Sequence, residues 1–423
     1  MITRADVVER VREWGLREDV VEKDYVLGWV LWGIGTDPRL STSWVFKGGT
    51  CLKKCYIETY RFSEDLDFTV MPHGPISPED VMPMLREVLA RVAEESGIDF
   101  AVAEPRLRAR PDGTATEGRV YYRGPRQAPG PASIKIDLSS DDRVVRPPVL
   151  RTIAHPYPDT FTHGGSVRCY SFEEVFAEKI RAMGQRGRPR DLYDIVNLFR
   201  RHDLRLHGDL VRGLLEEKCR IKDIPVPTAA TVVAGPHLHE LEAEWGNMLG
   251  HQLPALPPLQ QFLEEIPALF SWLEGTLEAV APPALALAAD EDPGWSPPPT
   301  IATWRVGVPL EVVRFAATNH LCVDLSYQGT LRAIEPYSLR STRAGNIVLH
   351  ALRVDNKEHR SYRVDRIAGV SVTTTPFVPS WAIEFSSHGA MVAPPTARGN
   401  RTSRTRRTAR ARTGRPGLRR RRR

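Results

Sequence analysis

Long hydrophobic runs are missing from this chain of 423 residues. None reaches the roughly 18 apolar residues that a membrane-spanning helix needs. The N-terminus is charged and does not open the apolar run typical of a signal peptide. These two absences argue against a membrane-embedded or secreted protein. We therefore expect a cytoplasmic protein with no membrane partner.

Cysteine is also scarce. The five cysteines are an odd number and form no paired C-x-x-C clusters, a pattern that indicates neither a disulfide framework nor a zinc ribbon. Cys51 and Cys55 are four residues apart and share one face of an expected helix. We expect them to pack there as small apolar side chains. All five thiols are expected to be reduced.

An excess of basic charge is missing outside the C-terminal tail. The segment Arg398–Arg423 holds thirteen arginines and no acid, so subtracting these charges from the net +6 leaves −7 for the rest. The folded body is therefore mildly acidic, and any nucleic-acid affinity of the body must come from local patches. Residues 393–423 are too polar to fold and are expected to be disordered. This tail either adds salt-sensitive affinity for RNA or DNA or is an extension without function.

The length indicates more than one domain, because single domains usually contain about 100–200 residues. Hydrophobic periodicity predicts an α+β domain over residues 1–205 and a helical lobe over residues 206–285. An Ala/Pro-rich linker over residues 286–300 separates both from a domain of short strands over residues 301–385.

The central motif is a glycine turn followed by an acidic strand. An apolar run leads into Phe46–Lys53 (F-K-G-G-T-C-L-K), and the segment Arg61–Val70 (R-F-S-E-D-L-D-F-T-V) follows. Asp65 and Asp67 alternate with apolar residues, so in a strand both point to one face. Each motif alone is typical of an ordinary turn or a solvated strand. Together, in this order, they predict a Mg²⁺ site beside backbone amides that hold phosphate.

Two later segments carry further candidates. Residues 132–139 (A-S-I-K-I-D-L-S) have one apolar and one polar face, so Asp137 is a third candidate carboxylate for the metal. Ser171 and Glu174 form a capping box at the start of the next expected helix. The segment Arg186–Asp194 (R-G-R-P-R-D-L-Y-D) is by itself typical of an exposed charged turn between two helices.

The order of strand, glycine turn, helix and acidic strand resembles the DNA-polymerase-β-like nucleotidyltransferases. More narrowly, F-K-G-G-T-x-L-x-K, R-F-S-x-D-L-D-F and A-E-K-I-R-A…R-G-R-P-R-D-L-Y-D-I resemble the AbiE-type (AbiEii/AbiGii) abortive-infection toxins. Those toxins are the nucleotidyltransferase partners of type IV toxin–antitoxin pairs. The resemblance implies a polymerase-β-like mixed sheet with a helical lobe, and a nucleotidyltransferase that uses Mg²⁺.

The site residues follow from the motifs and the resemblance together. We expect Asp65, Asp67 and Asp137 to hold the metal, and the resemblance makes Asp137 the general base toward the incoming hydroxyl. The resemblance also implies that Lys179 reaches the phosphates and that Asp191 completes the catalytic set. The expected nucleotide-binding residues are Lys47, Gly48, Gly49, Thr50, Ser63, Lys179 and Arg190.

By the same resemblance, the reaction moves a nucleotide from an NTP to an RNA acceptor, with the 3′ end of tRNA as the first choice. The expected outcome is growth arrest or phage defence, neutralised by a separately encoded antitoxin. The intact set of three acids favours this reading over a first domain that binds nucleotide without transferring it.

The last part of the chain predicts a small β-barrel. After a short helix over residues 311–319, the predicted strands are residues 321–327, 330–337, 346–352 and 360–367. The phrases Y-x-G, R-A-I-E-P-Y-S-L-R and Y-R-V-D-R-I resemble the WYL domain, an SH3/Sm-like module that serves as a ligand or nucleic-acid sensor. Residues 347–349 (I-V-L) depart from the W-Y-L that often stands there.

The WYL resemblance provides the alternative function, a sensor or regulator whose first domain binds nucleotide without transferring it. The candidate ligand pocket is formed by Tyr327, His350, Arg363 and Arg366. The two arginines also have a purely structural reading, because acidic residues that could pair with them are close in sequence. These acids are Asp355, Glu358 and Asp365.

Overall fold

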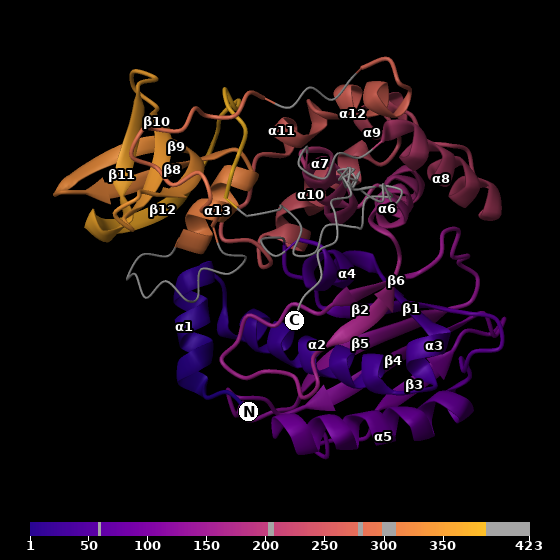
Figure 1. Cartoon of the computed structure of the whole chain (residues 1–423). Helices are drawn as coiled ribbons and strands as arrows, with labels where there is room; N and C mark the ends of the chain where they lie inside the picture. The colour runs from indigo at the N-terminus through magenta and orange to yellow at the C-terminus, as the bar shows by residue number, and fades with distance from the viewer. Residues whose placement is uncertain (58–60, 202–206, 278–281, 298–309, 386–423) are drawn as a thin grey trace, which may run out of the picture. The chain divides into compact units, whose positions relative to one another are not determined.

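The computed structural model describes five stretches of the chain (Figure 1). The predicted tail over residues 393–423 lies outside them. In the described part, no helix is both long enough and apolar enough to cross a membrane. The described stretches are residues 1–57, 61–201, 207–277, 282–297 and 310–385.

Two helices open the chain. α1 (Arg4–Trp14) begins with a capping box in which the Thr3 side chain accepts from the Asp6 amide, and it ends at Gly15 in the left-handed region. α2 (Glu18–Thr36) is buried along most of its length and packs against α5 (Pro78–Ser96) and the strand β7 (Ser166–Cys169). It is therefore a core helix rather than a surface helix.

A mixed sheet of seven strands in the described residues forms the centre of this region (Figure 1). The spatial order is β3-β4-β5-β2-β1-β7-β6, with β2 parallel to β5 and β1 parallel to β7. The short helix α3 (Leu40–Ser43) precedes β1, and α4 (Gly48–Cys55) follows it. The strands are β1 (Trp44–Lys47), β2 (Asp65–Val70), β3 (Arg106–Ala109), β4 (Ala115–Tyr122), β5 (Ala132–Ser139), β6 (Val149–Thr152) and β7 (Ser166–Cys169).

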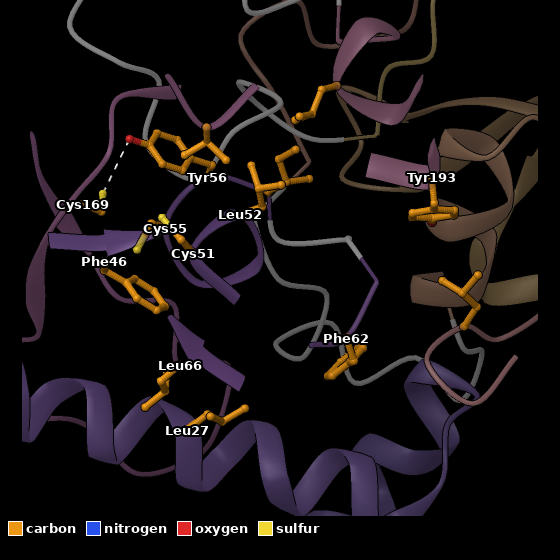
Figure 2. Close-up of a cluster of buried hydrophobic side chains, with 14 of the residues drawn as sticks. Leu27, Phe46, Cys51, Leu52, Cys55, Tyr56, Phe62, Leu66, Cys169 and Tyr193 are labelled. Carbon is orange, nitrogen blue, oxygen red and sulfur yellow. Dashed lines mark hydrogen bonds between the residues drawn. The ribbon is translucent and has the colours of Figure 1, made fainter. Parts of the chain in front are cut away.

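The apolar face of this sheet contributes to a continuous core, part of which is shown in Figure 2. Leu66 and Phe68 of β2 and Ile136 and Leu138 of β5 are buried. The residues between them along each strand are only partly buried. The alternation predicted from the sequence is therefore confirmed, and the polar face of β2 and β5 is the accessible one.

A group of helices follows the sheet in the chain. Ser171 caps the first helix by accepting from the Glu174 amide, as predicted. The second half of the predicted capping box is wrong, because the Glu174 carboxylate accepts from the amides of Val145 and Arg146 and pairs with Lys218 at 2.7 Å. The helices are α6 (Phe172–Arg186), α7 (Pro189–Phe199), α8 (Gly208–Ile221), α9 (Ala229–Val233), α10 (Leu238–Leu249), α11 (Leu259–Leu263) and α12 (Ile266–Leu273).

The last described part has a helix and an antiparallel sheet with the order β11-β10-β9-β8-β12. The predicted strand over residues 360–367 is wrong as a single element. A 3₁₀ turn, η3 (Val364–Arg366), ends β11, and β12 then pairs with β8. The elements are α13 (Leu310–Thr318), β8 (Leu321–Tyr327), β9 (Thr330–Ser341), β10 (Ile347–Arg353), β11 (His359–Arg363) and β12 (Ile367–Pro376).

The predicted linker contributes a buried residue to this sheet. Glu291 forms an isolated antiparallel bridge with Thr342, and its carboxylate lies 3.2 Å from Arg340 and 2.6 Å from His350. A composition break in the sequence therefore does not exclude ordered contacts. The proposed domain boundaries stay predictions.

Candidate active site

Strand pairing places the three predicted carboxylates on one face of the sheet. In the parallel register of β2 and β5, Asp67 stands beside Asp137 and Asp65 stands beside Lys135. Registered neighbours in a sheet point to the same face, so Asp65, Asp67 and Asp137 share the partly exposed side. We call these three residues the acidic face.

Asp137 has an oxygen that the protein leaves unpaired. Its Oδ2 atom accepts from Lys135 Nζ at 2.7 Å, while its buried Oδ1 atom has no hydrogen-bond partner among the described residues. Leaving a buried acceptor unsatisfied costs about 1–3 kcal/mol, and more for a charged group. A hard cation is the kind of ligand that removes this cost, because Mg²⁺ prefers carboxylate oxygen.

The electrostatics of the acidic face also favour a cation. Burial, and then repulsion from Asp137 and Asp65, raise the pKa of Asp67 to about 6, although Lys47 and Lys179 act in the opposite direction. Burial and the Asp137 carboxylate likewise raise the pKa of Asp65. The acidic face is thus short of positive charge.

Gly48 and Gly49 form a corner between β1 and α4 beside Asp67, which we call the glycine corner. α4 begins at Gly48 directly after β1, so the Gly-Gly-Thr segment is the first turn of the helix and not a separate turn before it. Gly48 has φ +80°, and a Cβ atom there would overlap Asp67 Oδ2. A Cβ atom on Gly49 would lie 2.6 Å from the Arg61 guanidinium. Both glycines are therefore required by close approach, and Gly48 also by its backbone conformation.

Two hydroxyl residues near this corner have different surroundings. Thr50 is buried and donates from Oγ1 to the Asp65 carbonyl oxygen at 2.6 Å, which fastens α4 to β2. Ser63 is only partly buried, and its Oγ atom would lie 3.0 Å from a Cβ atom on Gly49. The Ser63 side chain therefore lies at the glycine corner, whereas the Thr50 hydroxyl already donates a hydrogen bond within the protein.

Lys47 is held by a carboxylate that the sequence did not single out. It stands beside Asp67 in the register of β1 and β2, and its ammonium forms an ion pair with Asp142. Asp142 also pairs with Lys222 Nζ at 2.7 Å. Although burial opposes the charged form, Lys47 and Lys222 hold the pKa of Asp142 well below its usual range. Asp142 therefore positions the Lys47 side chain near the acidic face.

Lys179 and Asp191 belong to a separate group of buried charges. Lys179 Nζ lies 2.7 Å from Asp194 and 3.3 Å from Asp191, and Arg186 Nε lies 2.8 Å from Asp191. Arg61 binds both carboxylate oxygens of Asp194, at 2.7 and 2.9 Å. We call Arg61, Lys179, Arg186, Asp191 and Asp194 the buried ion cluster, in which all members except the exposed Arg186 are buried.

The two carboxylates of the buried ion cluster are fully compensated, because three cations surround them. Burial opposes ionisation of Asp191 and Asp194, but Lys179 with Arg186 lowers the pKa of Asp191, and Arg61 with Lys179 lowers that of Asp194. Arg61 also donates to the Gln252 side chain at 3.0 Å. The sequence identified Lys179 and Asp191 as site residues. It did not identify their link to Arg61, Asp194 and Gln252, because Arg61 contacts residues that are far from it in the chain.

Arg190 lies between these two groups. Its Nε atom is buried with no hydrogen-bond partner among the described residues. Burial and the charge of Arg61 lower its pKa, while Asp65 and Glu64 act in the opposite direction. Glu64 in turn pairs with Lys23 at 2.6 Å. A guanidinium with an unused donor beside the acidic face suits an anionic ligand such as phosphate.

The four residues proposed for the ligand pocket of the last sheet have different surroundings. His350 is buried between Glu291 and His359, Tyr327 packs edge-on against Tyr362, and Arg366 lies in η3. Arg363 pairs with Asp365 at 2.6 Å, one of the pairings that its structural reading expects. The ligand pocket stays a prediction.

Comparison with known proteins gives a match to one protein family. The family of the nucleotidyl transferase AbiEii toxin, type IV toxin–antitoxin system, matches residues 29–271, more than half of the chain. No match was found among curated proteins.

Similar solved structures include two nucleotidyltransferases. MenT4, a nucleotidyltransferase toxin from Mycobacterium tuberculosis, is 22% identical, with a TM-score of 0.46 over 66% of this chain and 91% of that chain. A protein from H. pylori assigned as a nucleotidyltransferase is 19% identical, with a TM-score of 0.40 over 62% of this chain and 100% of that chain. Both scores are below 0.5, so the assignment rests on the family match. The chain belongs to the AbiEii family of nucleotidyltransferase toxins of type IV toxin–antitoxin systems, and it is a nucleotidyltransferase.

Proposed function

We propose that this protein transfers a nucleotide from an NTP to an RNA acceptor, with the 3′ end of tRNA as the first acceptor to test, and that it requires Mg²⁺. The observation that carries the proposal is the pairing of Asp67 with Asp137 next to the glycine corner. A separately encoded antitoxin would neutralise the activity, as the family implies.

The acidic face fits Mg²⁺ by three properties. Its donors are carboxylate oxygens, one of these oxygens is buried and unpaired, and burial together with like charges raises the pKa of two of the three carboxyls. Asp65, Asp67 and Asp137 would hold the metal. When bound, Mg²⁺ supplies positive charge to the phosphate oxygens and the attacking oxygen of an in-line displacement.

The other residues have roles that follow from their positions. The free amides in the first turn of α4, at Gly48 and Gly49, would bind phosphate oxygens. The unused Arg190 donor and the Ser63 hydroxyl would contact the same triphosphate. Asp137 would also act as the general base toward the incoming hydroxyl, the role that the family resemblance implies. Asp191 and Lys179 would hold the α6–α7 corner and its charges in place.

The proposal is tested by incubating the protein with each labelled NTP, Mg²⁺ and total RNA. Transfer of label to RNA with one or more NTPs, abolished by a chelator and restored by Mg²⁺, is the expected result. Separation of the RNA by size then identifies the acceptor class. Label transfer that continues unchanged in the chelator would contradict the metal requirement, and label on protein alone would contradict the RNA acceptor.

A second candidate function is a WYL-type sensor or regulator, in which residues 301–385 form an SH3/Sm-like small barrel. The observation that favours it is the strand order. β8 lies between β9 and β12, so the strands that come first and last in the sequence of this sheet, β8 and β12, are neighbours. The same arrangement is needed to close a small barrel. No label transfer under any NTP, together with tight binding of a small ligand or DNA, would favour the sensor.

A further inference from the structure

Three buried thiols lie together away from the acidic face. Cys51 and Cys55 are on α4, Cys169 is the last residue of β7, and their sulfur atoms all lie within 4.8 Å of one another. Figure 2 shows the three side chains near Phe46 and Tyr56. We call Cys51, Cys55 and Cys169 the thiol cluster. The sequence suggested only the first two as helix neighbours, and Cys169 joins them because β7 pairs with β1 at Phe46.

The thiol cluster has spacing close to that of a metal site. Two sulfur ligands of a tetrahedral Zn²⁺ ion, each about 2.3 Å from the metal, are about 3.8 Å apart. A spread of at most 4.8 Å needs only small rotations of the three side chains to reach this distance. A fourth donor is close by, because the Tyr56 hydroxyl lies 3.6 Å from Cys169 Sγ.

A buried cation lies beside the thiol cluster. Arg151 is buried, and its guanidinium lies 4.8 Å from the centre of the Tyr56 ring. Three thiolates with one Zn²⁺ ion carry a charge of −1, which Arg151 balances.

We propose that Cys51, Cys55 and Cys169 bind one Zn²⁺ ion, with the Tyr56 hydroxyl in the fourth position. Zinc binding displaces the thiol protons to solvent, and the bound ion links α4 to β7. α4 carries Gly48 and Gly49 at its other end, so the ion would hold the glycine corner against the sheet. This site is separate from the Mg²⁺ site and does not depend on the proposed reaction.

The experiment uses the full chain, stripped of metal by a chelator under a thiol reductant and then titrated with Zn²⁺ and, separately, Co²⁺. One tightly bound Zn²⁺ per chain and the sulfur-to-cobalt charge-transfer absorption are the expected results. X-ray absorption at the zinc edge should give three sulfur atoms at about 2.3 Å and one oxygen. This measurement needs no variant, so it applies even where a cysteine replacement fails to fold.

Variants separate this cluster from the other buried cysteines. Cys169→Ala is expected to lose stoichiometric Zn²⁺ and the cobalt absorption, with the fold checked by circular dichroism. Cys219→Ala on α8 and Cys322→Ala on β8 also remove a buried thiol, and both should bind Zn²⁺ as the wild type does. Equal Zn²⁺ binding by Cys169→Ala, a zinc shell without sulfur, or a disulfide within the cluster in the untreated protein would overturn the proposal.

Discussion

The acidic face and the buried ion cluster contain the same kind of carboxylate in opposite electrostatic states. In the cluster, Asp194 has two cations within 3 Å, and its pKa is lowered despite complete burial. On the acidic face, Asp67 has two acids as neighbours, and its pKa is raised. Counter-charge, and not residue type, therefore separates a structural junction from a site that is ready for a cation.

The largest effect is expected for Asp67→Asn. We expect this substitution to abolish nucleotide transfer, by at least about 10³-fold, because it removes a ligand for the metal that stabilises developing charge. Stability in the chelator should stay the same or increase, since like-charge repulsion is relieved. Label transfer to RNA and urea unfolding provide the two measurements.

The control for Asp67→Asn is Glu94→Gln, which neutralises an exposed acid on α5. It should keep wild-type transfer and wild-type stability. Normal transfer by Asp67→Asn would remove Asp67 from the metal site, whatever the stability result.

The reverse result is expected for Asp194→Asn in the buried ion cluster. Asp194→Asn removes the carboxylate charge that Arg61 and Lys179 share and leaves Lys179 with Asp191, at a cost of about 3–5 kcal/mol in the free energy of unfolding. Urea unfolding at pH 7 measures this loss. An unchanged unfolding midpoint would show that the cluster does not hold the helices to the segment before β2.

The two regions should also respond to pH in opposite directions. Asp67 has a folded-state pKa of about 6, above its ordinary 3.8, so its contribution to stability falls as the pH rises from about 4 through 6. Asp194 has a lowered pKa, so its contribution is present above 3.8 and is lost as the pH falls below that value.

Urea unfolding of the metal-free protein between pH 4 and pH 8 tests this difference. Relative to Asp67→Asn, the wild type should lose about 1–3 kcal/mol over this range, from the shift in the pKa of one group. Added Mg²⁺ should reduce the loss. A difference between the two proteins that does not change with pH would contradict the raised pKa.

A smaller effect is expected for Gly48→Ala, for which Gly113→Ala is the control variant. Both glycines have positive φ, but Gly113 has no atom within 4 Å of an added Cβ, whereas Gly48 has Asp67 Oδ2. Each change should cost about 1–2 kcal/mol from the left-handed backbone alone. Gly48→Ala should cost more and also impair transfer. Equal stability losses with normal transfer in both variants would contradict the close approach of the glycine corner to Asp67.

The smallest effect is expected for Arg363→Ala. This arginine is exposed and pairs with Asp365, so its loss should change neither stability nor nucleotide transfer measurably. A loss of transfer would connect the last sheet to the reaction and would favour a regulatory pocket there. Label transfer under the same conditions as for Asp67→Asn measures it.

Local patterns predicted most of the acidic face. The alternation around Asp65 and Asp67 and the strand containing Asp137 required only neighbouring residues, and the structure has both strands where they were expected. The pairing of Asp67 with Asp137, and not with Lys135, depends on the register between two distant segments. One sequence contains no direct signal for that register.

The same reason explains what the sequence did not provide. Glu174 was expected to cap its own helix, but its carboxylate binds two amides in the loop after β5. The thiol cluster was not predicted because Cys169 lies far in sequence from Cys51. The break between β11 and β12 was not predicted because it depends on the pairing of β12 with β8. In each case, tertiary contacts and not local propensity determine the structure.

The bond between Arg61 and Asp194 has a consequence for synthesis. Asp67 and Asp137 emerge from the ribosome well before Asp194, so the nascent chain carries all three acids while the Arg61 charge still lacks its carboxylate. The contact that holds Arg61 against Gly49 can therefore form only once α7 has been translated, when 199 of the 423 residues have been made.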